Sequence, residues 1–142
     1  MPFLMFNYGE KVFAEAGVNK AAAQDLKLIV FKDNHTLADA DGDDVYTNKF
    51  TEADFPGYAS INLTAANWTC TPGAPTLLAY PEQLFQCNSD CPAQGVFGVV
   101  LVQTTSLKAL CGWTFGVPVN VSKSGDKIYH TPKINMKKPS EV

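Results

Sequence analysis

The sequence predicts an all-β fold, an antiparallel β-sandwich or barrel of jelly-roll-like form with extended N-terminal and C-terminal arms. Short apolar or alternating runs recur at near-regular spacing, Gly/Pro-rich turns separate them, and no long amphipathic helix interrupts them. A chain of 142 residues can bury one core and is too short for a second independent one. We therefore expect an N-terminal arm over residues 1–25, a β-sandwich body over 26–133 and a C-terminal arm or tail over 134–142.

The N-terminal arm has the composition of an extended segment. Its alanines permit a helical turn or two, but Gly17 and Asn19 interrupt the pattern and the apolar face is thin. It lacks the basic start and sustained apolar run of a signal peptide, and no run approaches the roughly 20 apolar residues that cross a bilayer. A net charge of -3 supplies no basic field for nucleic acid. We expect a soluble protein whose partners are proteins or small molecules, with no nucleic acid, membrane or cofactor.

Residues 25–32 predict a strand in the middle of a sheet. Leu28 and Val30 point to one face and Ile29 and Phe31 to the other, so both faces are apolar. Such a strand needs packing partners on both sides of the sheet.

The second half of the chain predicts several further strands. Residues 96–102 are the most strand-like run, rich in β-branched side chains, and we expect residues 108–115 to pair with them. Residues 117–121 read as an edge strand, where Pro118 is tolerated. We expect a hairpin turn at residues 124–127, leading into the last strand.

Residues 50–68 are the stretch around which the body is arranged. Pro56 and Gly57 give a turn signal, and residues 58–63 then place apolar side chains on alternate positions, which predicts a half-buried strand. Tyr58 and Trp68 bracket this strand with large amphipathic rings that suit a core with one polar atom near water. The stretch is typical of a framework and contains no catalytic set.

Residues 36–48 form an acidic loop. Three aspartates at alternate positions imitate the first ligands of a calcium site: Asp39, Asp41 and Asp43. Asp44 stands where a calcium loop needs glycine, and Phe50 stands where it needs a bidentate glutamate. A solvated acidic loop is therefore the expectation.

All four cysteines lie in one part of the sequence: Cys70, Cys87, Cys91 and Cys111. Cys87 and Cys91 have the spacing of one zinc-binding pair, but no second pair exists. The alternatives are at least one disulfide, free thiols in a buried core, or zinc. No metal site is assigned.

Catalytic constellations are not evident. Only His35 and His130 could serve a nucleophile as base, and neither lies in a recognisable motif. Cys111 lies in an apolar strand, where thiols are usually inert. Carboxylates for a glycosidase could come from a small group whose separation the sequence does not fix: Glu52, Asp54 and Glu82. We expect the protein not to be an enzyme.

The framework motifs resemble those of small virion proteins of tailed bacteriophages, the head decoration or cement proteins. The resemblance runs from about residue 26 to 136 and lies in a strand ending at Asn34, the T-E-A…G-Y-A segment at residues 51–59 and Trp68. A strand resembling G-Y-x-V follows at 96–101, with Phe97 before the glycine, and then a terminal G-D…P-x-L element at 125–134. The framework positions of interest are Gly57, Tyr58, Trp68, Gly98, Gly125 and Asp126.

This resemblance implies an oligomeric, all-β structural protein on the capsid surface, made in the host cytoplasm. Its partners would be the major capsid protein and further copies of itself, as a homotrimer at a three-fold position. The two arms are the expected contacts with the shell.

Other functions remain open. One is a tail- or fibre-associated receptor- or carbohydrate-binding module, which exposed aromatic rings at Tyr58, Tyr80 or Trp113 would favour. Another is a small hydrolase with a carboxylate pair. A third is a secreted glycoprotein domain, suggested by four N-x-S/T triplets at Asn34, Asn62, Asn67 and Asn120.

Overall fold

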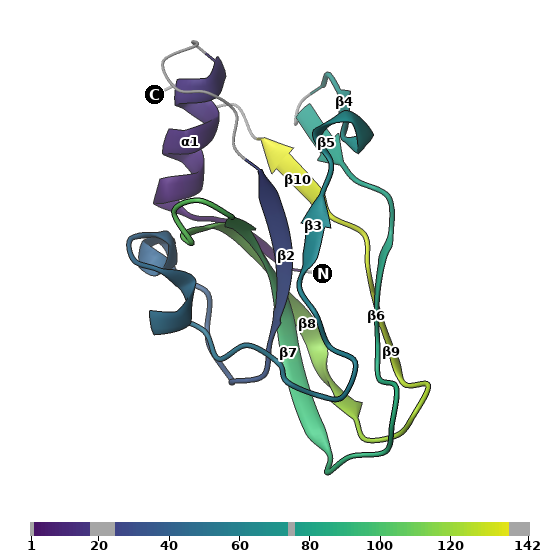
Figure 1. The fold of residues 1–142 in the computed structure, drawn as a ribbon. Coiled ribbons are helices and arrows are strands. Elements are labelled where there is room, and N and C mark those ends of the chain that lie inside the picture. The colour runs from purple at the N-terminus through teal and green to yellow at the C-terminus, as the bar shows by residue number, and fades with distance from the viewer. Residues whose placement is uncertain (1, 18–24, 74–75, 137–142) are drawn as a thin grey trace.

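The computed structural model describes residues 2–17, 25–73 and 76–136, and it confirms the all-β fold class with antiparallel sheets. One layer is a five-stranded sheet in the order β1-β8-β7-β2-β3 (Figure 1). Its strands are β1 (Phe3–Met5), β8 (Ala109–Val121), β7 (Gln94–Gln103), β2 (Leu26–Phe31) and β3 (Ile61–Leu63). The predicted pairing of residues 108–115 with 96–102 is confirmed in the β7–β8 ladder.

The second layer is a two-stranded antiparallel ribbon that bends midway, so that each of its two arms is divided into two short strands. The layer comprises β4 (Thr69–Thr71), β5 (Thr76–Ala79), β6 (Gln83–Gln86), β9 (Lys127–His130) and β10 (Lys133–Met136). The fifth strand, β4, pairs with β5 at one end of the ribbon. β5 pairs with β10 and β6 pairs with β9. Pro81 and Pro132 lie at the break between the two ladders, which a hydrogen bond from the Tyr80 N–H to the Pro132 carbonyl spans at 3.0 Å. Proline cannot donate to a ladder, so the ribbon bends at this point.

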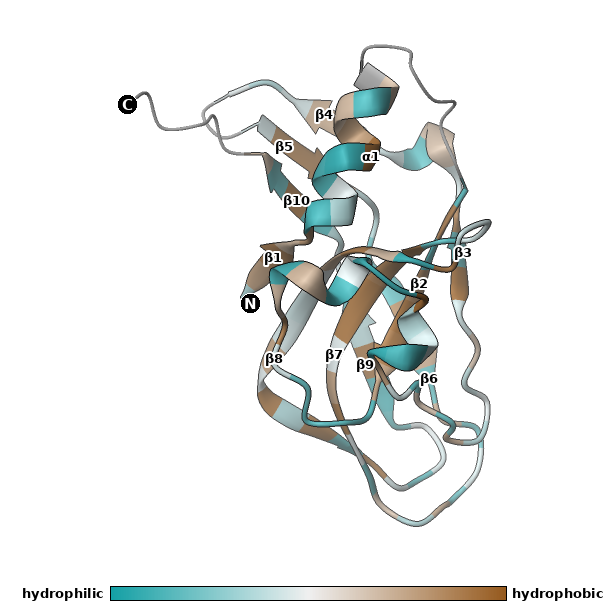
Figure 2. Ribbon diagram, turned by 90° about the vertical axis from the view of Figure 1, so that its left-hand side faces the viewer, coloured by the Kyte–Doolittle hydropathy of each residue, from teal (hydrophilic) through white to brown (hydrophobic). Residues whose placement is uncertain are grey.

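The central sheet is packed on both faces, as the alternation in residues 25–32 predicts. Leu28 and Val30 belong to the core between the two layers. Ile29 and Phe31 belong to a second core on the opposite face, together with Phe50. Apolar colour follows β7 through the middle of the molecule in Figure 2.

The N-terminal segment differs from the extended arm that the sequence suggested. Within it, α1 (Asn7–Gly17) is a three-turn helix and β1 is an edge strand of the main sheet, with Leu4 opposite Gly112. Phe6, between the two elements, is fully buried in the second core, and its N–H donates to the Leu110 carbonyl at 2.9 Å. Burial of Phe6, directly before the helix, stabilises α1 although the apolar face of the helix itself is thin. Residues 18–24 and 137–142 lie outside the described residues, and residues 134–136 belong to β10.

The strand predicted over residues 58–63 is shorter than expected. Only Ile61–Leu63 forms β3, which pairs with the beginning of β2. At the other end of β2, Glu52 bridges Phe31, and the Ala53 N–H donates to the Val30 carbonyl at 2.8 Å. Residues 54–60 leave the sheet between these two contacts, so the ladder along this edge of β2 is interrupted.

The expected hairpin at residues 124–127 is wrong. A turn is present, since Gly125 has a φ of +92°, but β8 before it and β9 after it belong to different layers. Turn chemistry is local and does not specify which sheet the next strand joins. The turn therefore connects the two layers of the sandwich.

Candidate functional site

Tyr58 fills the interruption in the ladder along β2. The Val30 N–H donates to the Tyr58 hydroxyl at 3.1 Å, and that hydroxyl donates to Glu52 Oε1 at 2.9 Å. The Tyr46 hydroxyl donates to Glu52 Oε2 at 3.2 Å. Burial, and to a lesser degree the Glu52 carboxylate, raises the pKa of Tyr58 well above its ordinary value, so the phenol keeps its proton. The Tyr58 hydroxyl thus supplies the hydrogen-bond partner that the Val30 N–H lacks in the ladder.

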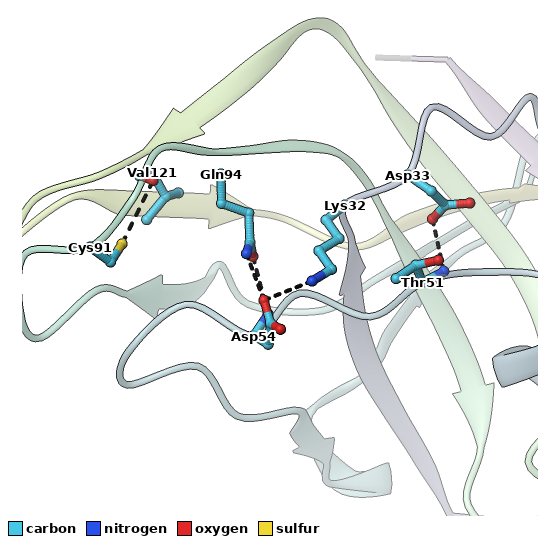
Figure 3. Close-up of polar contacts among 7 residues, drawn as sticks. All are labelled: Lys32, Asp33, Thr51, Asp54, Cys91, Gln94 and Val121. Atoms are coloured by element: carbon cyan, nitrogen blue, oxygen red, sulfur yellow. Dashed lines mark hydrogen bonds and ion pairs between the residues drawn. The ribbon is translucent and has the colours of Figure 1, made fainter.

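Asp54 forms a second set of hydrogen bonds, which holds this segment against Lys32 and Gln94 (Figure 3). Its Oδ1 accepts from Lys32 Nζ at 2.9 Å and from Gln94 Nε2 at 2.6 Å, while its own N–H donates to Gln94 Oε1 at 3.1 Å. The hydrogen bond from Lys32, followed by that from Gln94, lowers the pKa of the Asp54 carboxyl. Glu82 lies exposed between β5 and β6. The three carboxylates considered for a hydrolase thus have three different surroundings.

The two histidines lie in different environments. His35 Nε2 is 2.8 Å from Asp41 Oδ2, an oxygen that also accepts the Ala38 N–H at 2.8 Å. Asp41 is buried, contrary to the expected solvated loop, because it serves this local network. His130 is buried against the Trp113 ring at a centroid distance of 4.6 Å, and burial lowers its pKa to about 4. Its Nε2 has no hydrogen-bond partner among the described residues.

The four cysteines are free thiols. Cys111 is fully buried in β8, and burial raises its pKa well above the ordinary value. Cys70 is exposed on β4. Cys87 is buried and Cys91 is partly exposed. Burial, followed by the neighbouring Cys87 thiol, raises the pKa of Cys91. Among the residues that the structure describes, no group of three or more His, Cys, Asp or Glu side chains could hold a metal ion.

The framework glycines occupy positions with specific backbone or packing demands. Gly57 has a φ of +86°, where an L side chain is strained. A Cβ atom at Gly98 would lie 2.6 Å from the Phe31 ring and would also overlap the Trp113 carbonyl. Asp126 Oδ2, next to Gly125, accepts two backbone N–H groups at 2.9 Å, which lower its pKa.

Trp68 lines an apolar cavity together with residues of α1, β5 and β10. These three elements lie at the same end of the molecule (Figure 1, Figure 2). The Trp68 ring packs edge-on against Tyr80 at a centroid distance of 5.1 Å. The cavity measures about 200 Å³, and Phe13 of α1, Leu26 of β2 and Ile134 of β10 contribute to its lining. The sequence did not indicate it, because its walls come from segments far apart in the chain.

A projection on β8 was also missed. Thr114 and Val119 pair with Gly98 and Val96, so residues 115–118, which we call the β8 bulge, lie opposite a single residue of β7. The extra residues push the chain out of the sheet. The signal in the sequence is the Gly-Val-Pro run at 116–118, which breaks the alternation of a half-buried strand.

The β8 bulge is apolar, exposed and next to an open strand edge. Val117 is 79% exposed, the highest value among the exposed large hydrophobic side chains described. β1 covers this edge of β8 only as far as Trp113, followed by a hydrogen bond from the Thr114 N–H to the Pro2 carbonyl at 3.1 Å. Beyond that point no described strand pairs with this edge of β8. The arrangement offers both an apolar contact and free backbone groups.

Comparison with protein families, curated proteins and solved structures finds no match for this chain. In the described part of the chain, no helix has the length and apolar character needed to cross a membrane.

Proposed function

We propose that this chain is a non-enzymatic virion structural protein, a capsid decoration (cement) protein that clamps neighbouring major capsid subunits. The resemblance of residues 26–136 to decoration proteins of tailed bacteriophages supports this assignment. In this proposal the protein acts at the capsid surface as a homotrimer, and its contacts are with protein.

The observation that carries the proposal is the β8 bulge. A large apolar side chain held in water at Val117 costs hydration free energy that a partner surface would recover. The adjacent open edge of β8 can accept an extended segment of a neighbouring subunit by strand addition. The N-terminal segment, with Phe6 buried in its own domain, is less suited to the role of a free clamping arm than the sequence suggested.

The test combines light scattering with co-sedimentation on assembled shells of a candidate phage capsid protein that lack this chain. We expect a trimer that binds shells saturably. Val117→Lys should weaken binding about tenfold or more, the effect of a lost interface anchor. Leu84→Lys, the same change at an apolar residue 41% exposed on β6, is the matched control and should bind like the wild type.

A monomer that does not bind shells would contradict the decoration function. Unchanged binding of both variants would assign shell binding to a different surface, and equal weakening of both would show that Val117 has no specific role in it. A carbohydrate-binding module would instead bind a glycan array. The aromatic rings considered for that function do not favour it, since Tyr80 and Trp113 are buried and the Tyr58 hydroxyl is engaged with Glu52.

A further inference from the structure

Cys87 and Cys91 lie four positions apart in the short loop between β6 and β7. The Cys87 thiol donates to the Ser89 carbonyl at 3.0 Å, which directs its sulfur into the loop. The Cys91 sulfur lies 3.9 Å from the Val121 carbonyl (Figure 3). Burial, followed by the neighbouring Cys87 thiol, raises the pKa of Cys91, so the two thiols lie close enough to interact.

The backbone at both cysteines is held by the turn that follows β8. The Cys87 N–H donates to the Asp126 carbonyl at 2.9 Å, and the Cys87 carbonyl accepts the Gly125 N–H at 2.8 Å. The Cys91 N–H donates to the Ser122 carbonyl at 2.9 Å. Because one turn anchors the backbone at both cysteines, folding brings the two residues together and raises their effective concentration.

The other two cysteines are too far away to compete. Cys111 and Val121 lie opposite Leu101 and Gln94 of β7, which are seven positions apart, a strand distance on the order of 20 Å. Cys70 lies opposite Leu78 in the second layer, and Leu78 is nine positions before Cys87, a similar distance along the ribbon.

We propose that Cys87 and Cys91 are a redox-active pair that forms a reversible intramolecular disulfide by exchange with a small-molecule disulfide of the glutathione type. Cys91 is the more accessible sulfur, and its raised pKa leaves only a small thiolate fraction to react. That thiolate attacks the reagent, breaks its S–S bond and releases one thiol, which takes up the proton Cys91 lost. Cys87 then attacks the Cys91 sulfur as thiolate and releases the second thiol with the second proton. The two protein thiols are oxidised and the reagent is reduced to two thiols.

The experiment equilibrates the intact protein with excess oxidised glutathione and then alkylates the remaining thiols in denaturant. A protease that cleaves before aspartate cuts at Asp90, between the two cysteines, so the disulfide would hold two peptides together. Mass spectrometry with fragmentation locates the linked and the alkylated positions. We expect a Cys87–Cys91 link, with Cys70 and Cys111 alkylated, and complete reversal by reduced glutathione.

Single substitutions test the order of attack. Cys87→Ser should stop at a glutathione adduct on Cys91, whereas Cys91→Ser should leave the buried Cys87 largely free of adduct. Cys70→Ser, at an exposed and distant thiol, is the control and should form the link as the wild type does. Full alkylation of Cys87 and Cys91, a persistent adduct on wild-type Cys91, or links through Cys70 would each overturn the proposal.

Discussion

Single side chains complete the backbone hydrogen bonding of this protein where the chain leaves its sheet. The Tyr58 hydroxyl accepts from the Val30 N–H, which the interruption of residues 54–60 leaves without a strand partner. An aromatic ring with a polar tip suits this position, because the ring packs between Phe55 and Phe85 while the hydroxyl reaches the strand.

Tyr58→Phe should therefore destabilise the protein by about 1–3 kcal/mol, because it leaves the buried Val30 N–H without an acceptor. The measurement is the free energy of unfolding in urea. Tyr129→Phe, which removes the hydroxyl of a residue 53% exposed, is the matched control and should change stability by less than about 0.5 kcal/mol. Equal effects of the two variants would show that the hydroxyl of Tyr58 contributes nothing specific.

His130 should make stability depend on pH. Its pKa is lowered from 6.5 to about 4 in the fold, so the unfolded chain binds the extra proton in the window between these values. Stability is full above the unfolded pKa and falls as the pH drops from 6.5 toward 4, by a total of about 3 kcal/mol. Urea unfolding at several pH values would measure this loss.

His130→Phe should remove most of that loss and keep the ring contact with Trp113. His35→Gln, at the other histidine, should retain the loss of stability at low pH. An unchanged pH dependence in His130→Phe would assign the loss to other groups.

At the scale of elements, β7 and β8 depend on a close approach at Gly98. A Cβ atom there would overlap the Trp113 carbonyl and the Phe31 ring, so Gly98→Ala should cost about 1–3 kcal/mol of unfolding free energy. Gly116→Ala, in the β8 bulge, meets nothing within 4 Å and should be neutral or slightly stabilising. Thermal or urea unfolding distinguishes the two, and a neutral Gly98→Ala would contradict the packing described for this ladder.

The N-terminal elements can be tested through Phe6. Because Phe6 is fully buried in the second core, Phe6→Ala should destabilise by about 3–5 kcal/mol. Phe13→Ala, at a half-buried phenylalanine on α1, should cost less. A small effect of Phe6→Ala in urea unfolding would instead support a detachable arm over residues 1–25.

For the molecule as a whole, one sheet shared by two cores predicts a single cooperative unit. Val99 contributes to the core between the layers and its neighbour Val100 to the second core, so neither core can open without disrupting β7. Native-state amide exchange should therefore show the central residues of β2 and β7 exchanging only through global unfolding. Earlier exchange of the β2 amides than of the β7 amides would show that the sheet opens in parts.

The sequence predicted the elements whose pattern is local and long. Residues 25–32 and 96–102 are apolar on both faces, and the structure confirms them as central strands. The sequence pattern did not predict α1, because the position of this helix depends on Phe6 packing in a core assembled from distant segments. It also predicted wrongly that the turn at 124–127 joins two strands of one hairpin. The β8 bulge and the apolar cavity escaped prediction for the same reason, because both depend on register between segments far apart.

The pairing of β1 with β8 has a consequence for the order in which the protein can be assembled. Phe3, Leu4 and Met5 find their partners only at residues 111–113. At ordinary rates of translation, those partners follow the first strand by on the order of ten seconds. During that interval Phe6 has no strand β8 to pack against, so the nascent chain carries exposed apolar surface at its beginning. The main sheet closes only when most of the chain has left the ribosome.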